Sequence, residues 1–234
     1  MKSDTLVIVP AYNEEKNIEK VVHSIKKLYP FLDLIVINDG STDMTAAKAQ
    51  SAGALVLSHP FNMGYGVSLQ TGYKYAVYNN YQYLVQIDGD GQHDPSSIGK
   101  LLEVIKKGSA DIVLGSRFIE GNNYRTSIFR MVGIYLFRYV LKLLSGKEIK
   151  DVTTGFQAMN RRVLDLFITD VFPCDYPDAD VILLLSRLGF NIQEIPVIMY
   201  SNADGKSMHN NPVKVLYYIF KMILSMFLTK LRKY

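Results

Sequence analysis

Short runs of β-branched and aliphatic residues alternate with helical stretches through the first half of this 234-residue chain. Strands joined through helices run mostly parallel, and a sheet of this kind is covered by helices on both faces. We therefore predict an α/β fold with a mixed, mostly parallel sheet flanked by helices. The predicted strands are 6–9, 34–37, 55–57, 83–87, 112–114 and 192–198, and the predicted helices lie near 14–28, 42–52, 65–79, 95–107, 128–144 and 177–188.

Polar residues follow each of the first five predicted strands. Because the carboxyl ends of parallel strands meet at one edge of a sheet, ligands bind there, and we expect these loops to converge on one site. The first loop lacks the G-x-G-x-x-G pattern, so a dinucleotide-binding site is not expected. The loops are Tyr12 to Glu14, Asn38 to Asp43, Asn62 to Gly66, Asp88 to Asp94, and Ser116 with Arg117.

Two carboxylates, Asp88 and Asp90, follow the fourth predicted strand in the segment YLVQIDGDGQHDP. Mg2+ that binds a nucleotide is normally held by one or two carboxylates together with phosphate oxygens and water. The pair therefore predicts a divalent-metal site, although carboxylates in such a loop also cap backbone N–H groups. A calcium EF-hand is excluded, because His93 and Gly99 stand where that loop needs Gly and Glu.

Further residues in the loops suit a nucleoside diphosphate. Asp39 is placed to accept hydrogen bonds from a base or ribose, and Arg117 to meet the diphosphate. The Gly64-Tyr65-Gly66 triplet opens a helix, where it either presents backbone N–H groups to a phosphate or allows that helix to pack closely. We expect His93 to be a structural neighbour of the metal loop.

The composition is that of a globular protein, with 48% apolar and 21% charged residues. The one cysteine, Cys174, excludes an intrachain disulfide and fits a reducing compartment. The N-terminus enters a strand at once and lacks the apolar stretch of a signal peptide, so we expect a cytoplasmic protein.

Positive charge is concentrated in two segments, residues 121–147 and 206–234, which hold 11 of the 26 Lys and Arg residues and no Asp or Glu. Long aliphatic and aromatic residues separate these cations, which suits an anionic lipid surface and argues against nucleic-acid binding. Each segment contains a largely apolar helix with basic interruptions, and the first is too short and too charged to predict a transmembrane span. Core packing, a homodimer and a membrane interface all suit such helices. We predict one domain, residues 1–210, followed by a basic amphipathic helix at 211–234.

Six motifs occur in order along the chain: VIVPAYNEEKNI, VINDGSTD, FNMGYGVSLQTG, IDGDGQHDP, ADIVLGSRF and DVTTGFQAMNRRVL. Together they resemble the family-2 glycosyltransferases of the GT-A fold, most closely the dolichyl- and polyprenyl-phosphate mannose synthase-like branch. The match covers about residues 4–207. This resemblance implies a GT-A (Rossmann-like) fold, inverting transfer of a sugar from a GDP- or UDP-sugar, Mg2+ or Mn2+ as cofactor, and a polyprenyl phosphate acceptor.

The resemblance also implies site residues by position. Asp90 with Gln92 would ligate the metal, and Arg117 and Arg130 would bind the acceptor phosphate. Lys206 is a further candidate for that phosphate, at the position discussed below where the chain departs from the family pattern. The residues implied to contact the nucleotide are Pro10, Ala11, Tyr12, Glu14, Asp39 and Asp88.

The candidate catalytic residues are Asp90, Arg117 and Asp151. A phosphate acceptor is already anionic and needs positioning by cations more than it needs a base. A saccharide hydroxyl would need a base, for which Asp151 is the candidate; capping a turn is the alternative role for Asp151.

One position departs from the mannose synthase-like branch, which usually has an Arg ahead of G-x-S-K in its late loop. Asn202 stands near that place, followed by Gly205, Lys206 and Ser207. The point charge of a lysine does not replace a bidentate guanidinium. The departure weakens the expectation of a lipid-phosphate acceptor and leaves the glycosyltransferase assignment intact.

Three functions follow from the sequence. The favoured one is transfer of a sugar to polyprenyl phosphate by a protein peripheral to the inner face of the membrane. The second is transfer to a saccharide hydroxyl of a lipid-linked or cell-envelope glycan, and the third is a non-catalytic nucleotide-sugar-binding membrane scaffold. A nucleotidyltransferase is disfavoured, because no Gly-rich basic loop follows the first strand.

Overall fold

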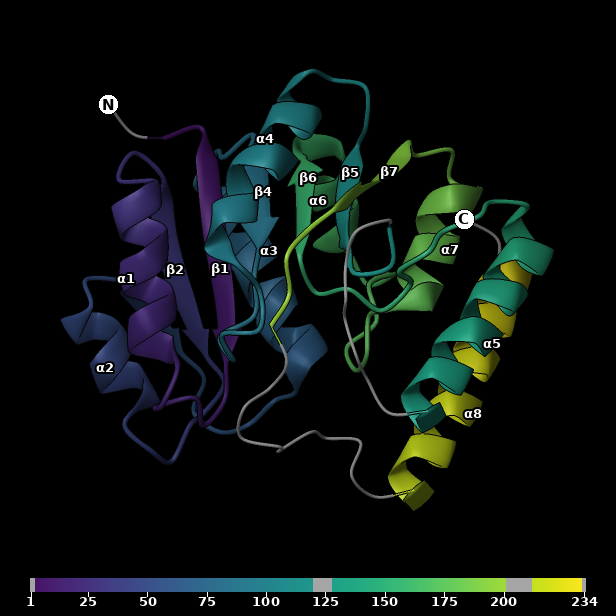
Figure 1. Ribbon diagram of the computed structural model, residues 1–234, viewed down its shortest axis with the longest axis horizontal. Helices are drawn as coiled ribbons and strands as arrows, with labels where there is room; N and C mark the ends of the chain where they lie inside the picture. The colour runs from purple at the N-terminus through teal and green to yellow at the C-terminus, as the bar shows by residue number, and fades with distance from the viewer. Residues whose placement is uncertain (1–2, 120–127, 201–211, 233–234) are drawn as a thin grey trace.

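The computed structural model describes residues 3–119, 128–200 and 212–232, in which a seven-stranded sheet lies between helices (Figure 1). The strand order is β3-β2-β1-β4-β6-β5-β7. The strands are β1 Thr5–Ala11, β2 Asp33–Asn38, β3 Leu55–Ser58, β4 Tyr83–Gln86, β5 Ile112–Ser116, β6 Gln157–Asn160 and β7 Ile192–Pro196. The helices are α1 Ile18–Leu28, α2 Thr45–Ser51, α3 Tyr65–Tyr78, α4 Ile98–Lys106, α5 Ile128–Ser145, α6 Arg161–Phe167, α7 Ala179–Arg187 and α8 Pro212–Leu231, with a 3-10 turn, η1, at Pro95–Ser97.

The sheet is mixed and mostly parallel, which confirms the predicted fold class. β1 pairs in parallel with β2 and β4, β2 with β3, and β5 with β7. β6 runs antiparallel between β4 and β5. The sequence analysis missed β6 and α6, because the four residues QAMN contain none of the β-branched side chains that mark a strand.

Two apolar clusters cover the two faces of the sheet. Val7, Val9 and Val36 point toward α1, α2 and α4, whereas Leu6 and Ile8 point toward the side that carries α3, α6 and α7. This alternation follows from the two-residue period of a strand. The central strands are therefore buried on both faces, and the polar edge of the sheet is the surface left for a ligand.

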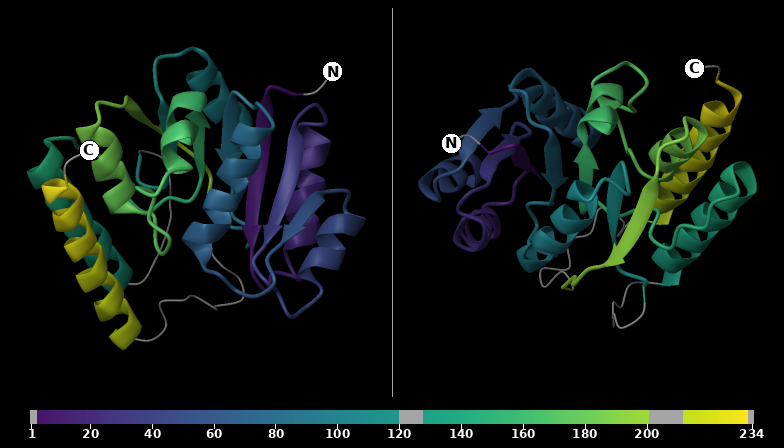
Figure 2. Two further views of the ribbon diagram at one scale, coloured as in Figure 1. Left: turned by 180° about the vertical axis from the view of Figure 1, so that it is seen from behind. Right: turned by 90° about the horizontal axis from the view of Figure 1, so that it is seen from above.

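α5 and α8 lie side by side at the end of the molecule away from α1 and α2 (Figures 1 and 2). α7 is buried along its length from Ala179 to Leu185 and contacts both helices. α8 buries Met222 and Met226 in this layer, so core packing is observed for one side of the helix. The large apolar residues that α5 and α8 expose are Val132, Tyr135, Tyr139, Leu143, Leu216, Tyr217, Phe220, Leu224, Phe227, Leu228 and Leu231.

Polar contacts orient α8 on the beginning of α7. Tyr218 donates a hydrogen bond to Asp178, and Ser225 donates to Asp180. Burial raises the pKa of Asp180 above its ordinary value. The predicted domain boundary at residue 210 falls outside the described residues. Within the described ranges, no helix combines the length and the apolar character needed to cross a membrane.

Candidate functional site

The loops after β1 and β2 are hydrogen-bonded to each other at the carboxyl edge of the sheet. Asn13 has a φ of +55°, a conformation that asparagine adopts more readily than most residues, and its side chain accepts a hydrogen bond from Thr42 N–H at 2.9 Å. The Asn13 N–H donates to Ser41 Oγ at 3.0 Å, and the Glu14 N–H donates to Thr45 Oγ1 at 2.8 Å. The two loops therefore form one rim.

The loop after β4 packs directly on the end of β1. The Gly89 N–H donates to Pro10 O at 3.3 Å, and a Cβ on Gly89 would lie 3.2 Å from Ala11 Cβ. Tyr12 follows with its side chain 46% exposed. The structure thus brings these three predicted nucleotide-contacting residues to the edge of the carboxylate loop.

Asp39 is buried and holds the loop that precedes α3. Its carboxylate accepts hydrogen bonds from the N–H groups of Met63 and Gly64 at 2.9 Å each, and His59 Nδ1 lies 2.7 Å from it. A carboxylate has about four acceptor positions, so these contacts leave about one. The predicted contact of Asp39 with a nucleotide base stays a prediction.

Asp88 is held at the end of β4 by two side chains. Tyr65 donates its O–H to Asp88 Oδ1 at 2.8 Å, and His93 Nε2 lies 3.0 Å from Oδ2. Burial would raise the pKa of Asp88, but the hydrogen bonds from His93 and Tyr65 and the charge of Arg117 keep this pKa below its ordinary value. Asp88 is therefore a fixed negative charge, and His93 has the structural role that the sequence predicted.

Asp90 and Glu14 add further negative charge beside Asp88. Burial, followed by the charge of Asp88, raises the pKa of Asp90. Burial also raises the pKa of Glu14, with contributions from the charges of Asp90, Asp43 and Asp88. The crowded carboxylates destabilise one another's charged forms, which a cation between them would relieve.

The donor atoms at this position suit a hard divalent cation that also binds a ligand. Among the described residues, no three His, Cys, Asp or Glu side chains are arranged to hold a metal ion by themselves. A cation at Asp88 and Asp90 would take its remaining oxygens from a nucleotide and water, as Mg2+ usually does. Gln92 donates both its backbone and its side-chain N–H groups to Asp90, which orients this carboxylate and leaves the Gln92 amide oxygen as a further ligand atom.

Arg117 and Asp151 form a buried ion pair, with side chains 2% and 0% exposed. Nε and Nη2 of Arg117 donate to the two carboxylate oxygens at 2.6 Å each, and Nη2 also donates to Thr153. Asp151 is therefore the counter-ion of Arg117, a role that the sequence analysis did not describe. It also accepts a hydrogen bond from the Thr153 N–H at 3.4 Å, which is the turn-capping role given as the alternative. The catalytic roles predicted for Arg117 and Asp151 stay predictions.

Three contacts near these groups were not foreseen from the sequence. Tyr65 links Asp88 to Gln86, whose side chain donates to the Tyr65 oxygen at 3.1 Å. A Cβ on Gly155 would lie 2.5 Å from Asp88 Oδ2, so only glycine fits there. A Cβ on Gly66 would lie 2.6 Å from the backbone of Cys174, which shows that the glycine triplet allows close packing. Sequence spacing carries no signal for contacts between such distant residues.

Two predicted acceptor-phosphate residues cannot be placed. Lys206 and the side chain of Arg130 lie outside the described part of the structure.

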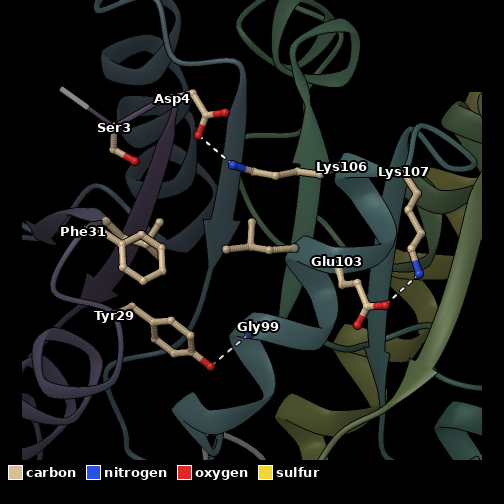
Figure 3. A pocket seen from close by; sticks show the side chains of 10 residues that line it. Ser3, Asp4, Tyr29, Phe31, Gly99, Glu103, Lys106 and Lys107 are labelled. Carbon is tan, nitrogen blue, oxygen red and sulfur yellow. Dashed lines mark hydrogen bonds and ion pairs between the residues drawn. The ribbon is translucent and has the colours of Figure 1, made fainter. Parts of the chain in front are cut away.

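A separate hollow lies at the opposite, amino edge of the sheet (Figure 3). Its charged and polar side chains already bind partners, since Lys106 pairs with Asp4 at 2.7 Å and the Tyr29 oxygen accepts from Gly99 N–H at 3.0 Å. The candidate site therefore remains at the carboxyl edge, where the carboxylates of Asp90 and Glu14 lack a cationic partner among the contacts described above.

The chain is similar to known proteins in its sequence and in its fold. A family model described as glycosyl transferase family 2 matches residues 6–167. A polyprenol monophosphomannose synthase from Mycolicibacterium smegmatis is 30% identical over 213 residues, covering 87% of this chain and 80% of that protein. A dolichol-phosphate mannosyltransferase from Pyrococcus furiosus is 33% identical over 216 residues, covering 86% of this chain and 58% of that protein.

A solved structure has the same fold. Glucosyl-3-phosphoglycerate synthase from Mycobacterium tuberculosis, in complex with Mn2+ and UDP-glucose, superposes with a TM-score of 0.71 at 24% identity. The superposition covers 97% of this chain and 78% of that chain.

Asp90→Asn is expected to preserve or raise the thermal stability of the ligand-free protein at pH 7. The folded-state pKa of Asp90 is raised, so its contribution to stability is complete below the unfolded-state pKa and is lost as pH rises through the folded-state value. Asp94→Asn is the matched control in the same loop. Hydrogen bonds from Ser96 keep the pKa of Asp94 low despite partial burial, so its contribution is lost as pH falls, and its removal should lower stability at pH 7. The thermal midpoints of both variants are measured from pH 4 to pH 7. If both variants were less stable than wild type at pH 7, the raised pKa of Asp90 would be contradicted.

Asp151→Ala is expected to lower the free energy of unfolding by about 3–5 kcal/mol, because it leaves the Arg117 guanidinium buried without a counter-ion. The double variant Arg117→Met/Asp151→Leu should recover part of this loss. Arg161→Ala, which breaks a partly exposed pair with Asp165, should cost less than about 1 kcal/mol. Urea unfolding compares the three, and equal losses for Asp151→Ala and Arg161→Ala would show that the pair is not buried in solution.

Proposed function

The chain belongs to glycosyl transferase family 2 and has the GT-A fold, and from this premise we propose that it moves a sugar from a nucleotide sugar onto a polyprenyl phosphate. The observation that carries the proposal is that the loop of Asp88 and Asp90 packs on the end of β1, whose own loop is hydrogen-bonded to the loop after β2. Burial and the neighbouring negative charges raise the pKa of Asp90 and Glu14 there. The names of the Mycolicibacterium and Pyrococcus relatives support the lipid-phosphate acceptor. Family membership makes the chain a glycosyltransferase, so a non-catalytic scaffold is not proposed.

We propose a GDP- or UDP-sugar as the donor, bound at this edge together with Mg2+ or Mn2+. Asp90 and Gln92 would hold the cation, whose charge offsets the negative charge of the departing nucleoside diphosphate. Asp88 supports this arrangement because Tyr65 and His93 keep its carboxylate charged and oriented. Asp39 has about one acceptor position left for an N–H group of the base.

The acceptor side of the proposal depends on cations and needs no base. A phosphate monoester is anionic at neutral pH, so its oxygen attacks the anomeric carbon without giving up a proton. Attack opposite the departing diphosphate inverts that carbon. The hydroxyl-acceptor alternative has less support, since Asp151, its candidate base, is buried and bound by Arg117. Arg117 and Arg130 stay proposed phosphate contacts on the resemblance, and Lys206 stays the proposed cation where the chain departs from it.

Incubation with polyprenyl phosphate, Mn2+ and radiolabelled GDP- and UDP-sugars is expected to move label into the organic phase. Asp90→Asn should lower the rate by about a hundredfold or more, because the charge that develops on the diphosphate then loses its stabilisation. Asp94→Asn should stay close to wild type, since that carboxylate caps η1. Absence of organic-soluble label with every donor contradicts the lipid acceptor, and equal rates for the two variants contradict the role of Asp90.

We also propose that the exposed face of α5 and α8 lies on a membrane surface. Both helices lack acidic residues and carry basic ones, including Lys142, Lys221 and Lys230. Exposed aromatic and aliphatic side chains beside basic residues suit the interface of an anionic bilayer. A second copy of the chain is the competing occupant, and the experiment below separates the two.

Phe220→Asp is expected to lower the fraction of protein that sediments with anionic liposomes, with a partition coefficient reduced about tenfold or more, because a phenylalanine side chain leaves the apolar phase. Phe31→Asp is the control, since Phe31 is 68% exposed and Phe220 67%, but Phe31 lies at the amino edge of the sheet. Point variants are preferred to removal of α8, which would open the core around Met222 and Met226. A wild-type dimer that Phe220→Asp dissociates, with no liposome binding by either protein, contradicts the membrane assignment.

A further inference from the structure

Arg138, on α5, has a half-buried guanidinium without a hydrogen-bond partner at two of its nitrogens. Nε and Nη2 are both buried and meet no acceptor among the residues that the structure describes. Burial lowers the pKa of Arg138, yet a guanidinium stays charged at neutral pH. A buried charged donor that is left unpaired is destabilising. An anion that accepted hydrogen bonds from Nε and Nη2 would remove this destabilisation.

The unpaired atoms of Arg138 form the edge that binds two oxygens at once. Arg117 uses the same two atoms, Nε and Nη2, to bind both oxygens of Asp151 at 2.6 Å. This side-on edge matches carboxylate or phosphate geometry. In Arg117 the edge is filled from within the protein, and in Arg138 no described residue fills it.

Aromatic rings hold the Arg138 guanidinium in place. Its Cζ lies 4.6 Å from the centroid of the Phe118 ring and 5.2 Å from that of Tyr135. The carboxylates that affect it are engaged elsewhere, Asp151 by Arg117 and Glu194 by the backbone N–H groups that begin the 150–155 segment. Arg138 is therefore oriented by cation–π contacts and lacks a counter-ion among these groups.

The surroundings of Arg138 indicate an anion attached to a hydrocarbon. Val132, Tyr135, Tyr139 and Leu143 follow one another along α5 at helical spacing and are 58% to 69% exposed. Arg138 thus adjoins an exposed apolar stripe through Tyr135. On its other side, Arg138 contacts Phe118, whose ring also lies against Arg117. Arg117 binds Thr153, and Gly155 in the same segment packs on Asp88.

We propose that the side-on edge of Arg138 binds the phosphate of a lipid-phosphate acceptor, whose hydrocarbon chain runs along the exposed stripe of α5. The proposal rests on the proposed function for the identity of the acceptor. It assigns to the acceptor a residue beyond Arg117, Arg130 and Lys206. Arg138 is a binding residue in this assignment, with no part in bond making.

Equilibrium binding of geranyl phosphate, a short water-soluble prenyl phosphate, tests the assignment without turnover. Arg138→Met keeps an apolar stem of similar length, and we expect its dissociation constant to rise about tenfold or more, because a bidentate, charge-assisted contact is lost. Arg138→Lys should fall between wild type and Arg138→Met. The control is Arg162→Met: Arg162 also lies over an aromatic ring, that of Phe190 at 4.9 Å, but is paired with Asp111.

Two further measurements exclude a merely structural role. The thermal midpoint of ligand-free Arg138→Met should equal or exceed that of wild type, since an unpaired buried charge has been removed. In the transfer assay, KM for the prenyl phosphate should rise while KM for the sugar nucleotide stays unchanged. A lower midpoint together with unchanged affinity for geranyl phosphate overturns the proposal.

Binding of geranyl phosphate and transfer of sugar, measured on the same variants, separate the Arg138 site from the proposed reaction. If wild type binds geranyl phosphate, Arg138→Met binds it weakly and no sugar is transferred, the Arg138 site stands and the proposed reaction fails. If wild type transfers sugar and Arg138→Met has unchanged affinity and KM, the Arg138 site alone fails. Weaker binding of Arg138→Met to phosphatidylglycerol vesicles, with unchanged affinity for geranyl phosphate, assigns the guanidinium to bulk lipid headgroups and also overturns the proposal.

Discussion

The buried ion pair between Arg117 and Asp151 is the interaction on which the rest of the site depends. Neither side chain has solvent to compensate its charge, so each is tolerated in the core only with the other. The pair joins the end of β5 to the segment that leads into β6. This segment carries Thr153, which Arg117 binds, and Gly155, which packs on Asp88. The ion pair therefore fixes the position of the segment 151–155. This segment separates the carboxylates around Asp88 from the region of Arg138.

The two regions that the segment 151–155 separates carry opposite charges that the described residues do not neutralise: negative on the side of Asp88 and positive on the side of Arg138. Asp88, Asp90 and Glu14 lie on one side, where burial and then the neighbouring negative charges raise the pKa of Asp90 and Glu14. Arg138 lies on the other, near an ion pair that does not neutralise it. A cation with a diphosphate fits the first side, and an oxyanion fits the second. The reaction proposed above, from a nucleoside diphosphate to a lipid phosphate, would use both environments.

The pattern of apolar residues along the sequence was enough to predict most strands of the sheet. β1 to β5 begin and end within two residues of their predicted bounds, because each contains a continuous apolar run, even β3, which is not buried at the edge of the sheet. β6 has no such run and exists through its pairing with β4 and β5. α8 is apolar nearly all round, so its sequence left its contacts open. Docking on α7, through Tyr218 with Asp178 and Ser225 with Asp180, decided which side is buried.

The sequence by itself determined the residue types at the strand ends, and with them the prediction of a cation and a nucleotide at Asp88 and Asp90. Parallel strands bring those ends together whatever the details of packing. Only the tertiary structure decided how the charges are partnered. Asp151 follows Arg117 by 34 residues and Asp88 follows Tyr65 by 23, and no local period links such positions. The lack of a described counter-ion at Arg138 is likewise a property of the fold, since burial and partners are set by elements distant in the chain.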